Sequence, residues 1–328
     1  MKRTTPCRRW AALILLVMPL AAAGWGGRLH MDIGREAAQA APDEMKLWRM
    51  YARLVARYSV HPDLWKDYDP TEGERHYIDL EAYAPLTATN LPSDPTALRN
   101  GLYRYHGHVP WVIMDLQSKL TAAMATGNWV QAASLAAAQA HYVGDLHQPL
   151  HTTENYDGQL NGQNGAHMRW ESDMPAIHWR SGLMPEAQAE YISNLWPAVL
   201  GWLDQSHGRA VDVLAADYDA LRVADPARDP ETYHDYLWEA TGDLFIEQVH
   251  RAACALASLW YTAWVDAGRP EIPPPPASLS EASVWVPEPQ PEGMASWPFL
   301  AAFGVIAVVI VLLSMRRRPE PHRRDPSL

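Results

Sequence analysis

The chain has 328 residues, of which 48% are hydrophobic and 20% charged, and its formal net charge at pH 7 is −11. This composition is typical of a globular protein with a buried core and excludes a disordered or fibrous chain. Residues 25–315 contain 18 Lys and Arg against 36 Asp and Glu. A basic cradle is therefore excluded as the source of any affinity for nucleic acid.

The first 24 residues have the layout of a secretory signal peptide. Four basic residues lie within the first nine, an apolar stretch covers residues 10–23, and small residues close the segment at Gly24. We expect cleavage after Gly24, which would make Trp25 the mature amino terminus. Cys7 is lost with this segment, so Cys254 remains alone and no internal disulfide is predicted.

The central part of the chain is predicted to be all-α, with one multi-helix domain over residues 25–268. Apolar residues recur there at three- and four-residue spacings, and no alternating pattern indicates a sheet. Asp43, Thr96 and Asn128 are predicted helix caps. The predicted helices are His30 to Gln39, Asp43 to Tyr58, Thr96 to Ala125, Trp129 to Leu146, Pro185 to Gln205 and Glu231 to Ala267.

Residues rich in Pro, Asp, Asn and Gly predict loops over 61–94 and 148–163. Residues 269–293 read as a Pro-rich linker. The uncharged run over residues 294–315 is long enough for a transmembrane helix, and the three arginines that follow it indicate a basic cytoplasmic tail over residues 316–328. The expected location is therefore outside the cytoplasm, periplasmic or extracellular, with the domain anchored to the membrane by this C-terminal helix.

Two pairs of potential metal ligands have helical spacing. His141 and Asp145 lie four residues apart, His167 and Glu171 repeat this spacing, and His151 follows Pro149 in the loop between the pairs. One such pair alone is usually a surface or capping pair. Two pairs with a histidine between them supply more ligands than one tetrahedral zinc takes, and therefore predict a metal cluster.

With these ligands in chain order, the sequence resembles the zinc-dependent phospholipase C and single-strand-specific nuclease superfamily, over most of residues 25–268. The resemblance adds three earlier ligands, namely Asp63, His76 and His30, together with the amine and carbonyl of Trp25. It implies three zinc ions with Asp145 as a bridge. The implied sets are Asp63, His76, His141 and Asp145; His151, His167 and Glu171; and Trp25, His30 and Asp145.

Several nearby residues compete with these assignments. His61, Asp67 and Asp69 are rivals in the variable segment between Asp63 and His76, and His178 competes with His167. Arg169 and Asp79 are candidates for orienting ligands or phosphate. Of the remaining histidines, His106 and His108 are expected at the surface or just behind the ligands. The others are expected on helix faces or ends, namely His147, His207, His234 and His250.

Three dications would reverse the local sign of this acidic protein and attract a phosphate ester. The expected reaction is phosphoester hydrolysis by a metal-bound hydroxide. As the resemblance implies, Asp63 would orient the water and Lys66 would lie beside the phosphate, as in the nuclease branch. The favoured substrate is single-stranded nucleic acid or a nucleotide, and no protein partner is inferred.

Two alternatives remain open at this stage. Glu171 and the expected membrane tether suggest a phospholipase C that acts on phospholipid headgroups. A non-catalytic, zinc-binding surface module belongs to a different class, and an intact site at Trp25 argues against it.

Overall fold

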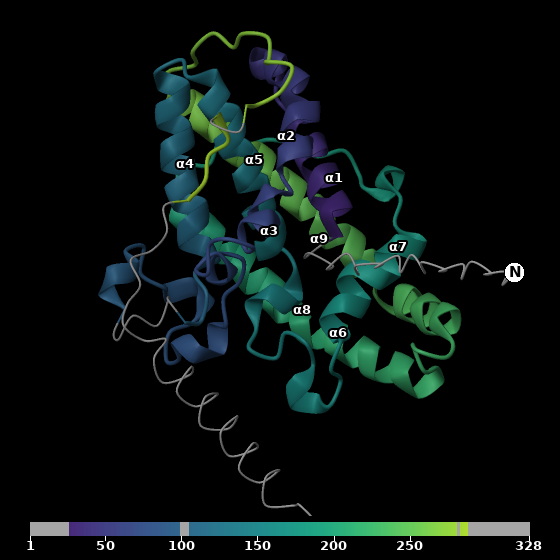
Figure 1. Cartoon of the computed structure of the whole chain (residues 1–328). Coiled ribbons are helices and arrows are strands. Elements are labelled where there is room, and N and C mark those ends of the chain that lie inside the picture. Colours follow the sequence, from purple (N-terminus) through teal and green to yellow (C-terminus); the bar gives the residue numbers. More distant parts are fainter. Residues whose placement is uncertain (1–25, 99–104, 281–282, 288–328) are drawn as a thin grey trace, which may run out of the picture. The chain divides into compact units, whose positions relative to one another are not determined.

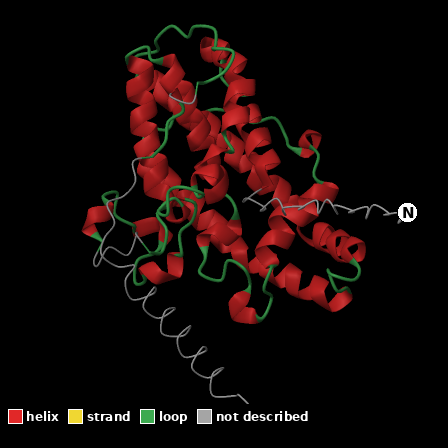
Figure 2. Cartoon of the chain, in the orientation of Figure 1, coloured by secondary structure: helices red, strands yellow, loops and turns green. Residues whose placement is uncertain are grey.

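The protein is described by a computed structural model over residues 26–98, 105–280 and 283–287. Within these ranges the secondary structure is helical and no strand is present (Figure 2), which confirms the predicted helical class. The predicted signal peptide, Trp25, the predicted transmembrane helix over 294–315 and the tail lie outside the described residues. No described helix is both long and apolar enough to cross a membrane.

Five long helices form the body of the domain (Figure 1). They are α1 (Gly26–Gln39), α4 (Val109–Ala125), α5 (Trp129–Leu146), α8 (Leu195–Val223) and α9 (Pro230–Asp266). The shorter α-helices are α2 (Ala52–Tyr58), α3 (His61–Trp65), α6 (Ala166–Met168) and α7 (Met174–His178). The 3-10 turns are η1 (Asp43–Tyr51), η2 (Gly73–Arg75), η3 (Leu80–Tyr83), η4 (Ala88–Asn90), η5 (Pro95–Ala97), η7 (Pro149–Thr152), η8 (Gln159–Asn161) and η10 (Ser181–Leu183), and η9 (Arg169–Asp173) is a π-helical turn.

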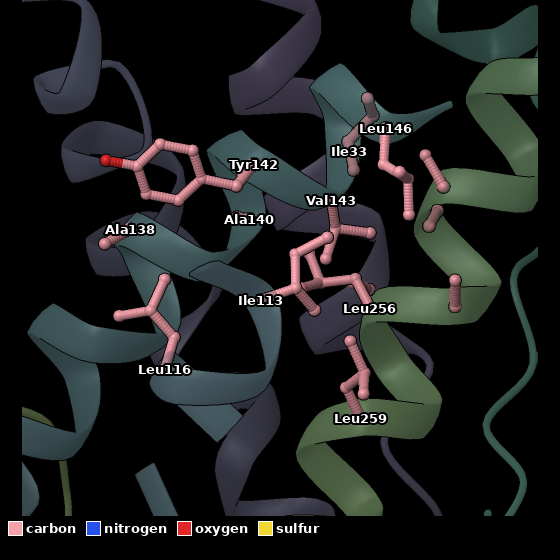
Figure 3. Close-up of a cluster of buried hydrophobic side chains, with 14 of the residues drawn as sticks. Ile33, Ile113, Leu116, Ala138, Ala140, Tyr142, Val143, Leu146, Leu256 and Leu259 are labelled. Carbon is pink, nitrogen blue, oxygen red and sulfur yellow. The ribbon is translucent and has the colours of Figure 1, made fainter. Parts of the chain in front are cut away.

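Helix α5 is the centre of the core. It contacts α1, α2, α4 and α9, and every residue from Ala132 to Leu146 is buried. Figure 3 shows apolar side chains meeting here, among them Ile33, Ile113, Val143 and Leu256, which belong to α1, α4, α5 and α9. The many alanines of α5 allow its neighbours to approach closely, so polar residues near its C-terminal end are enclosed as well.

The predicted bounds hold where local signals are strong. Helix α5 matches its prediction at both ends, and the Asn128 side chain caps it by accepting a hydrogen bond from the Gln131 N–H at 3.2 Å. Helix α9 differs from its prediction by one residue at each end, and α1 begins four residues earlier than predicted.

Two predicted helices start too early in the chain. The helix expected from Thr96 begins only at Val109, where Pro110 occupies the first turn, and Thr96 instead lies in η5. The helix expected from Pro185 begins at Leu195 and continues to Val223. The preceding segment is extended because its N–H groups are bound by α9 side chains, as in Ile192 N–H to Thr262 Oγ1 at 2.9 Å.

Two smaller predictions are also corrected. The helix expected over Asp43 to Tyr58 is a 3-10 segment followed by α2, with non-helical backbone at Met45, and Pro42 rather than Asp43 is the N-cap. The segment 61–94, expected as loop, begins with α3. Because α3 carries Asp63, this short helix has a direct effect on the site.

The Pro-rich segment lies against the domain as far as it is described. We call residues 269–280 and 283–286 the C-terminal strap (yellow-green in Figure 1). The Tyr58 hydroxyl donates to the Leu279 carbonyl at 2.9 Å and accepts from the Leu279 N–H at 3.0 Å, and Ile272 and Leu279 are buried. The Trp285 ring packs edge-on against Trp65 of α3 at 5.7 Å. This part of the predicted linker is therefore part of the folded unit.

Candidate metal centre

The fold brings the predicted metal ligands of the described chain together. Trp25 lies outside the described residues, and the other eight side chains come from α1, α3, α5, α6 and the turns around them. Within each of three groups, the potential ligand atoms lie within 4.8 Å of one another. The groups are His30, Asp63 and His141; His76, His141 and Asp145; and His151, His167 and Glu171.

Asp145 lies between two sets of histidines. Its Oδ2 atom is 2.9 Å from His76 Nδ1 and 3.3 Å from His141 Nε2. Its Oδ1 atom faces the other way, 3.5 Å from His30 Nε2 and 3.6 Å from His151 Nδ1. Burial alone would raise the pKa of Asp145, but His141, His151 and His76 hold that pKa far below its usual range. An ionised carboxylate with each oxygen facing different ligands has the geometry of a bridge.

His30 is enclosed against α5. Its ring stacks on His141 with 3.8 Å between centroids, and neither ring nitrogen has a hydrogen-bond partner in the described part of the chain. A Cβ at Gly144 would lie 2.8 Å from His30 Nδ1, so only glycine leaves room for this ring. Burial and the adjacent His141 lower the pKa of His30 to about 3, which keeps the imidazole neutral and able to bind a metal.

Helix α3 places Asp63 and Lys66 at the same edge of the centre. The Lys66 ammonium donates to Asp63 Oδ1 at 2.8 Å, while Asp63 Oδ2 is buried and has no hydrogen-bond partner among the described residues. Burial would raise the pKa of Asp63, but His141 and Lys66 hold it well below its usual range. The arrangement presents a charged carboxylate and a partly exposed cation at one point.

The third group is built from two turns. The side chains of His167 and Glu171 approach each other across α6 and η9. His151 Nε2 lies 3.2 Å from His167 Nε2 and 3.3 Å from Glu171 Oε2, and Gln148 donates to the same Glu171 oxygen at 2.6 Å. Burial opposes the proton on His151, but the carboxylates of Asp145 and Glu171 raise its pKa to about 9.

The predicted rivals lie outside these three groups. His61 packs on the Tyr58 ring, Asp69 binds Arg75 and Thr71, and Asp67 is exposed. His178 stacks on Trp238 and lies 3.2 Å from Asp235.

The two predicted orienting residues differ in what they contact. Arg169 binds Asp217 and the carbonyls of Gln163 and Asn164, so it stabilises the loop before His167 rather than facing a phosphate. Asp79 lies 3.3 Å from His106 Nδ1 and lines the cleft described below.

Sequence reasoning missed Glu72, a fully buried carboxylate beside the centre. Its Oε1 atom lies 3.1 Å from His76 Nε2, and the Tyr142 hydroxyl donates to the same oxygen at 2.5 Å. The four-residue spacing between Glu72 and His76 was a possible signal, although it falls in a segment expected to be loop.

A cleft of about 630 Å³ opens over the third group. Lys66, His76, His151, His167 and Glu171 contribute to its lining. Its walls also include Tyr77, Asp79, Tyr156 and Asp157. The centre is therefore accessible to a ligand from one side.

The donor set fits zinc. Imidazole and carboxylate are zinc ligands, and the three groups contain no thiolate. Buried polar atoms without a hydrogen bond are costly. Four such atoms belong to residues of this centre, namely Asp63 Oδ2, Asp145 Oδ1 and both nitrogens of His30. Bound dications would satisfy three of these atoms directly, since one nitrogen of His30 can face a metal.

Across the described residues, a helical domain that gathers histidines and carboxylates around a central aspartate, below an open cleft, has the architecture of a metal-dependent hydrolase. A model of the S1/P1 nuclease family matches residues 32–257, and the chain belongs to this family. The resemblance derived from the sequence is thereby confirmed. The family consists of zinc-using hydrolases that act on phosphodiester bonds.

The chain is also similar to a protein of Bradyrhizobium tropiciagri that is described as a probable serine protease. The two are 23% identical over 193 residues, which is 51% of this chain and 25% of the relative. The chain therefore spans about a quarter of the length of that relative.

Proposed function

We propose that this protein is a zinc-dependent phosphodiesterase that cleaves single-stranded nucleic acid or nucleotides. The observation that carries the proposal is the Asp63–Lys66 pair, in which a carboxylate of the metal centre is bound to a cation that lines the cleft. A phosphate lying over the centre would meet this ammonium as negative charge develops on its oxygens. A zinc module with no catalytic role would have no need for such a pair.

Three zinc ions are assigned to the centre. We assign one to Asp63, His76, His141 and Asp145, the second to His151, His167 and Glu171, and the third to His30, Asp145 and the amine and carbonyl of Trp25. When bound, these ions would polarise phosphate oxygens and lower the pKa of water. They would also offset the negative charge that surrounds the centre in this acidic chain.

The protein's own groups have separate tasks in this proposal. The Asp63 carboxylate orients the attacking water by accepting a hydrogen bond from it. Lys66 holds a non-bridging phosphate oxygen by a charge-assisted hydrogen bond. Asp145 would be a ligand of two of the ions and would thereby help to determine where the phosphate is bound.

The cleft walls favour nucleic acid as the substrate. Tyr77 and Tyr156 offer aromatic surface and Asp79 and Asp157 offer hydrogen-bond acceptors. Aromatic rings stack on any nucleobase, which suits binding without strong sequence preference. The acidic acceptors are suited to base amino groups.

Phospholipase C activity is the second candidate. Glu171 supports it because the nuclease pattern that the sequence resembles has Asp as the usual residue there. The predicted anchor over residues 294–315 would also hold the domain close to a lipid surface.

For either substrate, we propose that the protein is exported by its signal peptide and is located on the non-cytoplasmic side of the membrane.

A substrate panel tests the proposal. The exported protein, loaded with zinc, is assayed on single-stranded DNA, RNA, mononucleotides, double-stranded DNA and phosphatidylcholine vesicles. We expect cleavage of the single-stranded polymers at a rate at least tenfold above that on vesicles. Cleavage of phosphatidylcholine alone would select the phospholipase, and failure to hydrolyse any phosphodiester would favour the non-catalytic zinc module.

A further inference from the structure

His76 differs from the other buried histidines of the centre in how its second nitrogen is held. His141 donates its Nδ1–H to the Ser59 carbonyl at 2.8 Å, and His151 donates its Nδ1–H to the His76 carbonyl at 2.9 Å. His76 instead directs Nδ1 toward Asp145 and places Nε2 3.1 Å from a carboxylate oxygen of Glu72. Among these three histidines, His76 is therefore the one whose second nitrogen faces a carboxylate rather than a backbone carbonyl.

Glu72 is itself held in place by two other side chains. Arg75 donates to Glu72 Oε2 at 2.5 Å and also to Asp69 Oδ2 at 2.8 Å. The Tyr142 hydroxyl donates to Oε1 at 2.5 Å, and Tyr142 follows His141 directly on α5. Glu72 is 0% exposed, so this network is shielded from water.

These contacts determine which imidazole nitrogen is protonated when the other binds a metal. A carboxylate bound by arginine and by a hydroxyl donor accepts hydrogen bonds only, so His76 Nε2, which faces Glu72, carries a proton. The other nitrogen, Nδ1, faces Asp145 and His141, and in the proposed zinc-bound protein its lone pair would be the metal ligand. A carboxylate behind a ligating histidine sets its tautomer and ring orientation and raises its basicity.

We propose that Glu72 is a positioning residue that acts through His76 on the metal held by His76, His141 and Asp145. The inference rests on the zinc site proposed above and adds a residue outside its ligand sets. Glu72 does not touch the ion or the substrate. Its role is to keep Nδ1 of His76 deprotonated and aimed into the centre, with Tyr142 and Arg75 holding the carboxylate in turn.

The test measures zinc binding directly, by chelator competition on the full-length protein. Glu72→Gln preserves shape and one acceptor oxygen but removes the charge and can present an amide N–H to His76. We expect the affinity for one zinc ion to fall about 10- to 100-fold, as for other partners of metal-bound histidines. The visible spectrum of the cobalt-substituted protein should change as well. Activity should recover toward the parent value as zinc is raised, because all ligand atoms remain.

Asp69→Asn is the matched control. Asp69 is a buried carboxylate that binds the same arginine, but none of its described hydrogen bonds is to a histidine. The zinc affinity of the Asp69→Asn protein should stay within threefold of that of the parent protein. Equal losses in the two variants would mean general damage to the loop and would overturn the inference, as would an unchanged affinity in Glu72→Gln.

Tyr142→Phe is a second variant that tests the same inference if Glu72→Gln does not fold. It removes only the hydroxyl donor to Glu72, so zinc affinity should fall in the same direction, by about three- to tenfold, and no fall would overturn the inference. Failure of the zinc site itself is distinguishable. In that case the parent protein binds no zinc, whereas an error about Glu72 alone leaves a zinc-binding parent with an equally competent variant.

Discussion

The Nε2 atom of His30 lies 3.5 Å from Oδ1 of Asp145, and neither atom has a hydrogen-bond partner within the described residues. The other oxygen of Asp145 faces His76 and His141. One carboxylate therefore serves both sides of the centre, from the first helix of the domain to its central helix. We therefore expect substitutions of His30 and Asp145 to have unequal effects on zinc binding and activity.

Asp145→Asn should damage the protein more than His30→Ala does. The amide keeps the size of Asp145 but loses the charge and one oxygen acceptor, so binding of both ions that Asp145 is proposed to bridge should be weakened. We expect at least a 100-fold loss of phosphodiesterase activity for Asp145→Asn and about tenfold for His30→Ala. By elemental analysis, the zinc content should fall by about two ions in Asp145→Asn and by about one ion in His30→Ala. An Asp145→Asn protein with normal zinc and rate would exclude the bridge.

Gly144→Ala should selectively weaken the site at His30. The new Cβ would lie 2.8 Å from Nδ1 of His30, so the ring has to move away from Asp145. We expect loss of one zinc ion and a lower melting temperature. Gly201→Ala in α8 is the control, since its Cβ would meet nothing within 4 Å, and it should stabilise the helix by about 0.5–1 kcal/mol. If both variants retain full zinc, the close approach at Gly144 has no functional consequence.

Lys66→Ala should distinguish nuclease activity from phospholipase C activity as the function of this protein. Lys66 donates to Asp63 but is not a metal ligand, so zinc content should stay unchanged while nuclease kcat falls about 100-fold. Lys119→Ala removes a comparable ion pair with Asp115 on the exposed face of α4 and should leave the rate unaltered. Parental nuclease activity in Lys66→Ala would remove the main support for the nuclease assignment.

Zinc binding should release protons at neutral pH. In the zinc-free protein the pKa of His151 is about 9 and that of His141 is also raised, so a metal must displace protons from these rings. His30, with a pKa near 3, has none to lose at pH 7. Zinc affinity should therefore rise as pH increases toward 9 and fall as pH decreases. Calorimetry at pH 7 in two buffers of different ionisation enthalpy should show at least one proton released, and a value of zero would contradict these shifts.

The C-terminal strap should contribute to stability. Leu279 is buried and its backbone makes two hydrogen bonds with Tyr58, so Leu279→Ala should lower the free energy of unfolding by about 2–3 kcal/mol. Leu160→Ala, at a side chain that is 65% exposed, should change it by less than about 0.5 kcal/mol. Urea unfolding measures both. Equal effects would show that the strap does not pack on the domain in solution.

Local signals in the sequence were enough to predict much of the fold and most of the centre. The bounds of α5 follow from its cap at Asn128 and the proline after Leu146, and α9 follows from a long helical pattern. The ligand pairs His141–Asp145 and His167–Glu171 were predicted because a spacing of four on a helix brings side chains together whatever surrounds the helix. Family resemblance added His30, Asp63 and His76, which spacing alone does not connect.

Tertiary structure decided what depends on contacts between distant segments. The segment before α8 is extended because Thr262 and its neighbours on α9 bind its N–H groups, although its local pattern favours a helix. Gly144 matters only because His30, more than a hundred residues earlier, packs on it. The sequence alone suggests that Glu72 is a polar loop residue, whereas in the structure it is hydrogen-bonded by Tyr142 and lies against His76. Periodicity and capping act over a few residues, whereas burial and hydrogen-bond partners are set by packing across the whole chain, and a single sequence does not contain that information in local form.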